Sequence, residues 1–283
     1  MQTILKSKSN SVTIDTDGVF TIIGESINPT RRKKLIAAYE EREYDFVLEL
    51  AKSQIEAGAD ILDINVGIPG IDESQVMGEV VTAVSEAFDV PLCLDSPNPQ
   101  TLAAGLRAAP GRPLVNSVNG EEKALQAILP VVKEFGVPVI GLVIDDNGIS
   151  MDPEKRLSIA AKIIERAGQM GIPIEDIVID PLAMAVSADH NAGLVTLRTM
   201  ALIQEEFGVN MTLGASNVSF GLPQRQIINQ AFLALVIPNG ASCAITNAVR
   251  LTSTIRAIDL LLGRDEYSMR YIQHYRSMQK RNG

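Results

Sequence analysis

The feature that most constrains the fold of this chain is a regular alternation of short apolar runs and longer amphipathic stretches. The apolar runs predict eight strands, at Val19–Gly24, Ile61–Asn65, Leu92–Asp95, Leu114–Asn116, Val137–Val143, Ile177–Asp180, Met211–Gly214 and Cys243–Thr246. The stretches between them have helical spacing and predict eight helices, at Asp45–Ala57, Glu73–Phe88, Pro99–Ala108, Glu121–Phe135, Pro153–Met170, Gly193–Phe207, Arg225–Ile237 and Ala248–Leu262. Because strand and helix alternate strictly and such crossovers are right-handed, we predict an α/β fold of the closed (β/α)8 TIM barrel type.

The length of the chain and the ends of its helices favour one barrel over an open sheet. The 283 residues fit a single barrel, which typically takes about 250 residues. Gly58, Gly136, Gly171 and Gly208 closely follow helical stretches, where glycine adopts the left-handed conformation that ends a helix. A doubly wound sheet would show the same alternation, but residues 24–30 read GESINPT and lack its glycine-rich phosphate motif. We therefore predict one domain over residues 1–283.

Two extensions flank the repeats. Residues 1–18 include SVTIDTDG, which alternates apolar and polar residues up to a turn at Asp17-Gly18. This pattern predicts an N-terminal β-hairpin that plugs the bottom of the barrel. The tail at 264–283 has no strand pattern and predicts one extra C-terminal helix.

Composition excludes several classes of partner. The net charge of −9 argues against nucleic acid, whose phosphates require a basic surface. No apolar run approaches the roughly 20 residues that span a bilayer, so we expect no membrane segment. The two cysteines, Cys93 and Cys243, lie in apolar runs. We favour two reduced thiols over a disulfide and therefore expect a cytoplasmic protein.

Polar side chains stand at the carboxyl ends of the predicted strands, which meet at one mouth of a barrel. Asp63, Asp95, Asn116 and Asp180 lie at or next to the last position of four strands, and we expect them to form a shared ligand site. Other polar residues that follow strands are Glu25, Asn28, Asn65, Asn119, Ser216, Asn217 and Ser219. Each alone has a simpler explanation, because Asp and Asn also cap helices and form turns. Capping is a strong alternative for Asn119.

These residue types favour hydrogen bonding to a polar heterocycle over hydrolysis or metal chemistry. A carboxylate accepts two hydrogen bonds from an N–H/NH2 pair, and an asparagine both donates and accepts. A guanine-like or pterin ring presents that pattern along its edge. The two histidines, His190 and His274, have no Ser or Cys at nucleophile spacing, and neither HExxH nor CxxC occurs. We therefore expect no metal site and no Ser-His-Asp hydrolase.

Six motifs in order along the chain carry a resemblance to a known family. They are GESIN (24–28), LDINVG (62–67), CLDSPNP (93–99), VNS (115–117), IDPL (179–182) and GASNVSFGLP (214–223). They resemble the methyltetrahydrofolate:corrinoid protein methyltransferases of the pterin-binding barrel superfamily. The resemblance implies that Asp95, Asn116 and Asp180 hold the pterin ring, and that Asn217 meets N5 of the folate as the catalytic residue.

The resemblance also implies wider substrate contacts and a partner. Arg225 corresponds to a family arginine, and we add Glu25, Asn28, Asp63, Asn119 and Ser219 to the predicted substrate-binding residues. The implied reaction moves a methyl group between N5 of tetrahydrofolate and the cobalt of cobalamin. No DxHxxG signature for binding a corrinoid occurs, so the corrinoid is expected on a partner protein. A homodimer is the expected assembly.

Two alternatives and the direction of transfer stay open. A dihydropteroate synthase-like enzyme would carry a basic pair where this chain has Ser216 and Asn217, which counts against that activity. A non-catalytic folate-binding component of a methyl-transfer complex is the second alternative. Phe220 departs from the polar residue found in some relatives, and it slightly favours transfer from methylcobalamin to tetrahydrofolate.

Overall fold

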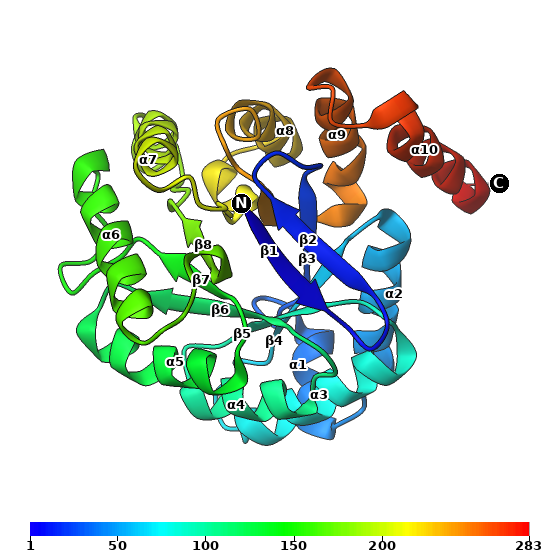
Figure 1. Ribbon diagram of the computed structural model, residues 1–283. Helices are drawn as coiled ribbons and strands as arrows, with labels where there is room; N and C mark the ends of the chain where they lie inside the picture. Colours follow the sequence, from blue (N-terminus) through cyan, green and yellow to red (C-terminus); the bar gives the residue numbers. More distant parts are fainter. Residues whose placement is uncertain (283) are drawn as a thin grey trace.

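The computed structural model describes residues 1–282, and a curled parallel sheet surrounded by helices forms its centre (Figure 1). The seven strands of this sheet have the spatial order β8-β7-β6-β5-β4-β3-β9. They are β3 (Thr21–Ile27), β4 (Ile61–Asn65), β5 (Leu92–Asp95), β6 (Leu114–Asn119), β7 (Val139–Leu142), β8 (Ile177–Asp180) and β9 (Cys243–Thr246). Every neighbouring pair is parallel, as helical crossovers require.

The predicted strand at Met211–Gly214 is an extended segment between the two edge strands rather than a regular strand. It forms isolated parallel bridges, from Met211 to Ile179 of β8 and from Gly214 to Ile245 of β9. The backbone leaves the extended region at Gly214, where ψ is 85°, because a 3-10 turn begins there. The segment lies in the place of an eighth strand, and the arrangement is consistent with a TIM-type barrel.

Ten α-helices in residues 1–282 cover the sheet or follow it. They are α1 (Lys33–Glu41), α2 (Asp45–Ala57), α3 (Glu73–Ala87), α4 (Pro99–Ala108), α5 (Glu122–Phe135), α6 (Pro153–Gln169), α7 (Ala192–Phe207), α8 (Arg225–Val236), α9 (Ala248–Leu261) and α10 (Met269–Asn282). Helix α1 was not predicted from the sequence, so two helices rather than one follow β3. The extra C-terminal helix that the tail predicted is α10. No helix in the described part of the chain is long and apolar enough to cross a membrane.

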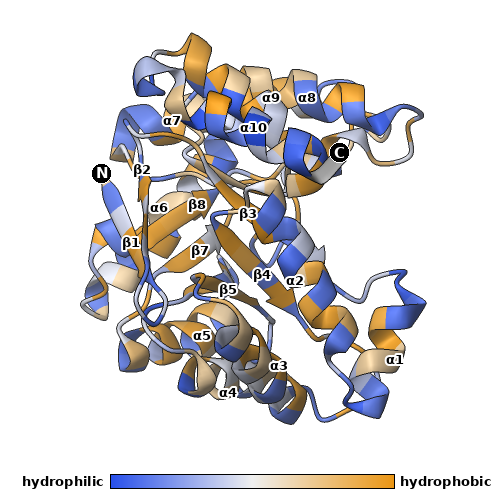
Figure 2. Ribbon diagram, turned by 90° about the vertical axis from the view of Figure 1, so that its right-hand side faces the viewer, coloured by the Kyte–Doolittle hydropathy of each residue, from blue (hydrophilic) through white to orange (hydrophobic). Residues whose placement is uncertain are grey.

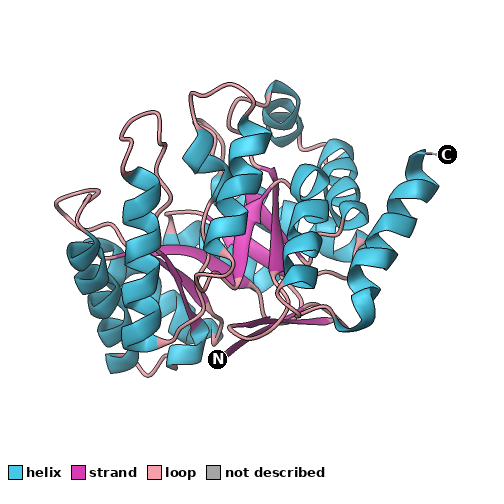
Figure 3. Cartoon of the chain, turned by 90° about the horizontal axis from the view of Figure 1, so that it is seen from above, coloured by secondary structure: helices cyan, strands magenta, loops and turns pink. Residues whose placement is uncertain are grey.

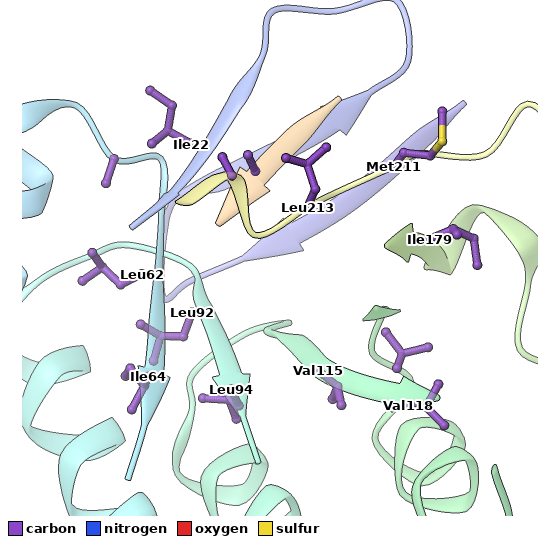
Figure 4. Close-up of a cluster of buried hydrophobic side chains, with 14 of the residues drawn as sticks. Ile22, Leu62, Ile64, Leu92, Leu94, Val115, Val118, Ile179, Met211 and Leu213 are labelled. Carbon is purple, nitrogen blue, oxygen red and sulfur yellow. The ribbon is translucent and has the colours of Figure 1, made fainter. Parts of the chain in front are cut away.

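Alternation within each strand separates two apolar layers. The outward side chains, such as Leu62, Leu94 and Ile179, point toward the surrounding helices in Figure 4 and form the larger buried cluster. The inward side chains at the starts of the strands form a second cluster, which includes Ile23, Ile61, Cys93, Leu114, Ile140, Val178 and Cys243. The hydropathy colouring of Figure 2 shows the strands as the apolar centre of the molecule. Since side chains two residues apart share a face, the next inward position on each strand lies nearer its carboxyl end.

The predicted N-terminal hairpin forms, but its turn differs from the prediction. Strands β1 (Gln2–Lys6) and β2 (Ser11–Asp15) pair antiparallel and are joined by residues 7–10, not by Asp17-Gly18. The Ser7 N–H donates to the Asn10 carbonyl at 2.9 Å, and Asp89 accepts a hydrogen bond from the Ser7 hydroxyl at 2.6 Å. Leu5 and Ile14 of the hairpin complete the inner apolar cluster. Figure 3 shows the hairpin at the end of the sheet opposite the long loops.

Candidate functional site

A cavity of about 450 Å³ opens at the carboxyl ends of the strands. It brings together seven of the ten predicted site residues: Glu25, Asn28, Asp63, Asp95, Asn116, Asp180 and Asn217. The polar groups that stand on strands follow directly from alternation, because each lies two residues after an inward apolar side chain, as Asp63 follows Ile61 and Asp95 follows Cys93. The barrel interior is therefore apolar at its base and polar at its mouth.

Two carboxyl groups and one amide, Asp63, Asp95 and Asn116, form the acidic wall of this cavity, and a second amide, Asn65, supports it from outside the lining. The Asn116 Nδ2 donates to Asp63 Oδ1 at 3.2 Å, and the Asn65 Nδ2 donates to Asp95 Oδ2 at 2.8 Å. Asn65 is fixed in turn because its Oδ1 accepts the Gly67 N–H at 2.8 Å. Because the Asn116 Nδ2 is engaged with Asp63, the side-chain Oδ1 of Asn116 is the atom free to accept a hydrogen bond from a ligand.

Burial and mutual repulsion disfavour charge on this wall. Burial raises the pKa of Asp63 well above its ordinary value, and the nearby Asp95 carboxylate raises it further. Burial also raises the pKa of Asp95, against the hydrogen bond from Asn65. The pair therefore binds a proton more readily than two isolated carboxyls. A ligand that donates N–H groups would relieve this penalty, because hydrogen bonds stabilise the ionised form.

Asp180 stands at the end of β8 on a separately braced loop. Burial raises the pKa of its carboxyl to about 7, against the Leu182 N–H that donates to Oδ1 at 2.8 Å and the positive charge of Arg156. The Arg156 guanidinium is itself buried and donates to the carbonyls of Pro181 and Leu182, both at 2.9 Å. Arg156 thus fixes the loop that positions Asp180 at the cavity.

Asn217 lies on a short 3-10 turn, η2 (Ala215–Ser219), directly after the extended segment. Its side chain folds back over Gly214. A methyl group built on Gly214 would lie 2.7 Å from Asn217 Nδ2, so the amide occupies the space that any other residue would fill. The Asn217 side chain is exposed, and it makes no hydrogen bond to any of residues 1–282. The cavity therefore contains an amide with both of its hydrogen-bonding groups available.

The turn that carries Asn217 is fixed from two sides. The Ser216 hydroxyl donates to Glu25 Oε1 at 3.1 Å. On the other side, Arg225 donates from its NH2 group to the Ser216 carbonyl at 2.7 Å and from Nε to the Ser219 hydroxyl at 3.0 Å. Arg225 and Ser219 lie outside the lining of the cavity, and these contacts place them as supports of the turn.

Of the two remaining predicted residues, one lines the cavity and one does not. Asn119 lies outside the lining, and its Oδ1 accepts the Glu121 N–H at 3.0 Å in the turn before α5, whose N-cap is Glu121. Asn28 lines the cavity and also accepts the Thr30 N–H at 3.0 Å. Seven further residues line the cavity but were not predicted as site residues from the sequence: Thr30, Arg32, Leu142, Leu182, Ala183, Gly214 and Ile245. Leu142 and Ile245 have only a weak signal, since each ends or nearly ends a predicted strand.

Comparison with known proteins agrees with this geometry. The model of a family described as "pterin binding enzyme" matches residues 24–247, which is more than half of the chain. The chain belongs to this family of pterin binding enzymes. Among family relatives, methylcorrinoid:tetrahydrofolate methyltransferase of Eubacterium limosum is 32% identical over 263 residues, which cover 90% of this chain and 96% of the relative.

Two other proteins are similar to this chain, one in sequence and one in fold. Methionine synthase of Mycobacterium tuberculosis is 30% identical over 83% of this chain, but the match spans only 21% of that longer protein. The solved structure of dihydropteroate synthase (DHPS) from Yersinia pestis with a pterine-sulfa conjugate has a TM-score of 0.71 and covers 92% of this chain and 98% of its own. At 18% identity, this second likeness shows the pterin binding fold alone.

Proposed function

We propose that this chain is a methyltransferase that moves a methyl group between N5 of tetrahydrofolate and the cobalt of a corrinoid protein. The observation that carries the proposal is the convergence of four carboxyls and three amides, carried by five strands and by the segments that follow strands, on one cavity. The name of the Eubacterium limosum relative, which matches over nearly its whole length, supports this reaction.

The cavity suits the polar edge of a reduced pterin. Asp95 and Asp180 accept hydrogen bonds from the ring N–H and amino groups, and the free side-chain Oδ1 of Asn116 accepts another. Asp63 acts behind Asn116 by holding the amide in that orientation. The volume of about 450 Å³ falls within the range of roughly 300–1,000 Å³ common for small-molecule sites.

Asn217 supplies the contact that changes during the reaction. N5 is a poor leaving group, because it keeps the electron pair of the broken N–C bond. The methyl group passes to cobalt(I), N5 takes up a proton from water to give tetrahydrofolate, and the amide hydrogen-bonds N5 while its charge changes. Oxyanion-type donors contribute about 2.7–4 kcal/mol in comparable sites. In the reverse direction, the same amide holds N5 while its electron pair attacks the methyl group of methylcobalamin.

The nucleophile in this scheme belongs to a substrate, so the chain needs none of its own. The corrinoid is carried by a partner protein that docks at the mouth of the cavity, and the proposed assembly of this chain is a homodimer in the cytoplasm. The favoured direction is from methylcobalamin to tetrahydrofolate. A chain of this kind has to bind the folate tightly and leave the mouth open toward the partner.

The test follows cobalt(I) and methylcobalamin by visible absorbance, with tetrahydrofolate or its 5-methyl derivative as the second substrate. Wild-type protein is expected to transfer the methyl group in at least one direction. Asn217→Ala is expected to slow transfer at least tenfold with little change in the folate Kd, because the contact acts mainly in the transition state. Folate binding without any transfer by the wild type would instead indicate a non-catalytic folate carrier.

A further inference from the structure

A second cavity of about 300 Å³ lies beside the first. The two cavities share Glu25, and Ser216 of the second cavity precedes Asn217 of the first. The hydrogen bond from the Ser216 hydroxyl to Glu25 Oε1 therefore marks their boundary. We call this space the side pocket, and its lining is Glu25, Ser216, Arg225, Gln226, Asn229, Asn247, Arg250 and Leu251.

The side pocket has the features of an anion site. Two helices begin at its wall, α8 at Arg225 and α9 at Ala248, and α8 has no side-chain cap to satisfy its first N–H groups. Helix N-termini favour negative charge. Arg225 and Arg250 add two guanidinium groups, and the Arg250 guanidinium has no hydrogen-bond or ion-pair partner within residues 1–282.

A buried amide gives an independent sign of a ligand. Asn229 is 8% exposed and lines the side pocket, yet its Oδ1 has no hydrogen-bond partner among the described residues. A buried amide left unpaired costs about 1–3 kcal/mol, so such groups normally have partners. A ligand that enters the pocket, or water it brings, would supply that partner.

The covalent structure of tetrahydrofolate determines which of its groups can reach the side pocket. The side arm of tetrahydrofolate leaves the ring at C6, which is bonded to N5. If Asn217 meets N5, the arm starts beside η2, on the side of the cavity where Ser216 and the side pocket stand. The arm ends in a glutamate, whose carboxylates match the arginines and helix starts.

We propose that the side pocket binds the glutamate carboxylates of the folate arm, with Arg250 as the principal ion-pair partner. This inference rests on the proposed function, since it takes the position of N5 from Asn217. Burial raises the pKa of the Glu25 carboxyl, which lessens its opposition to an anion, and its Oε1 is engaged by the Ser216 hydroxyl. Arg225 contributes its charge while it continues to support η2.

The experiment measures Kd by calorimetry for three ligands, namely tetrahydrofolate, its triglutamate and 6-methyltetrahydropterin, which has the ring without the arm. Arg250→Gln is expected to weaken tetrahydrofolate binding about tenfold, as loss of a charged hydrogen bond does. The same variant is expected to change the Kd for 6-methyltetrahydropterin less than about twofold, because the pterin cavity does not include Arg250. Arg276→Gln on α10 removes an exposed charge elsewhere and serves as the matched control.

The outcomes separate this inference from the proposed function. An equal loss for the armless pterin, or no loss for tetrahydrofolate, would overturn the side pocket as the glutamate site. A carboxylate-specific loss in Arg32→Gln but not in Arg250→Gln would also overturn it, because the arm would then leave past Arg32 of the first cavity. If wild-type protein bound neither the folate nor the armless pterin, the proposed function itself would fail.

Discussion

Gly214 gives the sharpest available test of how Asn217 is positioned. A methyl group at Gly214 would lie 2.7 Å from Asn217 Nδ2 and 3.4 Å from Cγ, and real contacts of this kind stay above 3.0 Å. The backbone at Gly214, with φ −73° and ψ 85°, does not require glycine. The substitution Gly214→Ala therefore acts on the amide of Asn217 rather than on the main chain.

The magnitude follows from the displacement. Restoring ordinary contact at 3.4 Å requires the amide nitrogen to move by about 0.7 Å, the difference between 3.4 and 2.7 Å. A misplacement of about 1 Å at a reacting group can cost roughly 100-fold in rate. We expect Gly214→Ala to slow methyl transfer about 10- to 100-fold, or about 1.4–2.7 kcal/mol. The folate Kd is expected to change little.

The assay is the visible absorbance of the corrinoid, followed for the single variants and for Gly214→Ala combined with Asn217→Ala. If the glycine acts only through the amide, the double variant is as slow as Asn217→Ala alone, because the two changes remove the same contact. Gly168→Ala is the control, since nothing lies within 4 Å of that position. Additive losses, or normal turnover in Gly214→Ala, would refute the positioning role.

Three further predictions concern Asp180 and Ser216. Asp180 has a pKa of about 7, and its ionised form is the one that binds a ring donating N–H groups. Folate affinity is therefore expected to fall up to about tenfold per pH unit below 7. A pH-independent Kd would contradict this role. Because this raised pKa makes the folded state lose stability as pH rises through 7, Asp180→Asn is expected to increase the free energy of unfolding by urea at pH 8 while weakening folate binding. Ser216→Ala removes the hydrogen bond to Glu25 and is expected to slow transfer several-fold and lower stability by about 1 kcal/mol. An unchanged rate with lowered stability would show that this bond serves the fold alone.

The sequence predicted the parts of this structure that depend on local pattern. Strands β4, β5, β8 and β9 begin and end at the predicted residues, because each apolar run ends at a polar residue. The same alternation placed the carboxyls of Asp63, Asp95 and Asp180 at one mouth. Helix α1 was not predicted; it spans only Lys33–Glu41, and Arg32 at its start makes no side-chain cap.

Features set by contacts between distant segments could not be predicted. The hairpin turn forms at residues 7–10 because Asp89, 82 residues from Ser7, accepts the Ser7 hydroxyl. Ser216 and Glu25 are 191 residues apart, and nothing in either motif indicates their hydrogen bond. Arg225 was predicted to bind substrate, and nothing in its motif indicates that it also supports η2 through its contacts with Ser216 and Ser219.

The hydrogen bonds that support η2 fix the main chain at Asn217 and leave its side-chain amide available to a ligand. Arg225 and Glu25 hold the main chain and hydroxyls of η2, so the turn itself has little freedom. The Asn217 side chain has no partner among the described residues and rests against a glycine, so only its two side-chain torsions remain to be set by a ligand. An amide on a rigid turn pays little entropy when it meets N5, since a buried side chain costs at most about 2 kcal/mol to order. Under the proposed function, binding energy from the rest of the folate is then available to place the ring, so the proposal assigns ring recognition to the carboxyls and catalysis to Asn217.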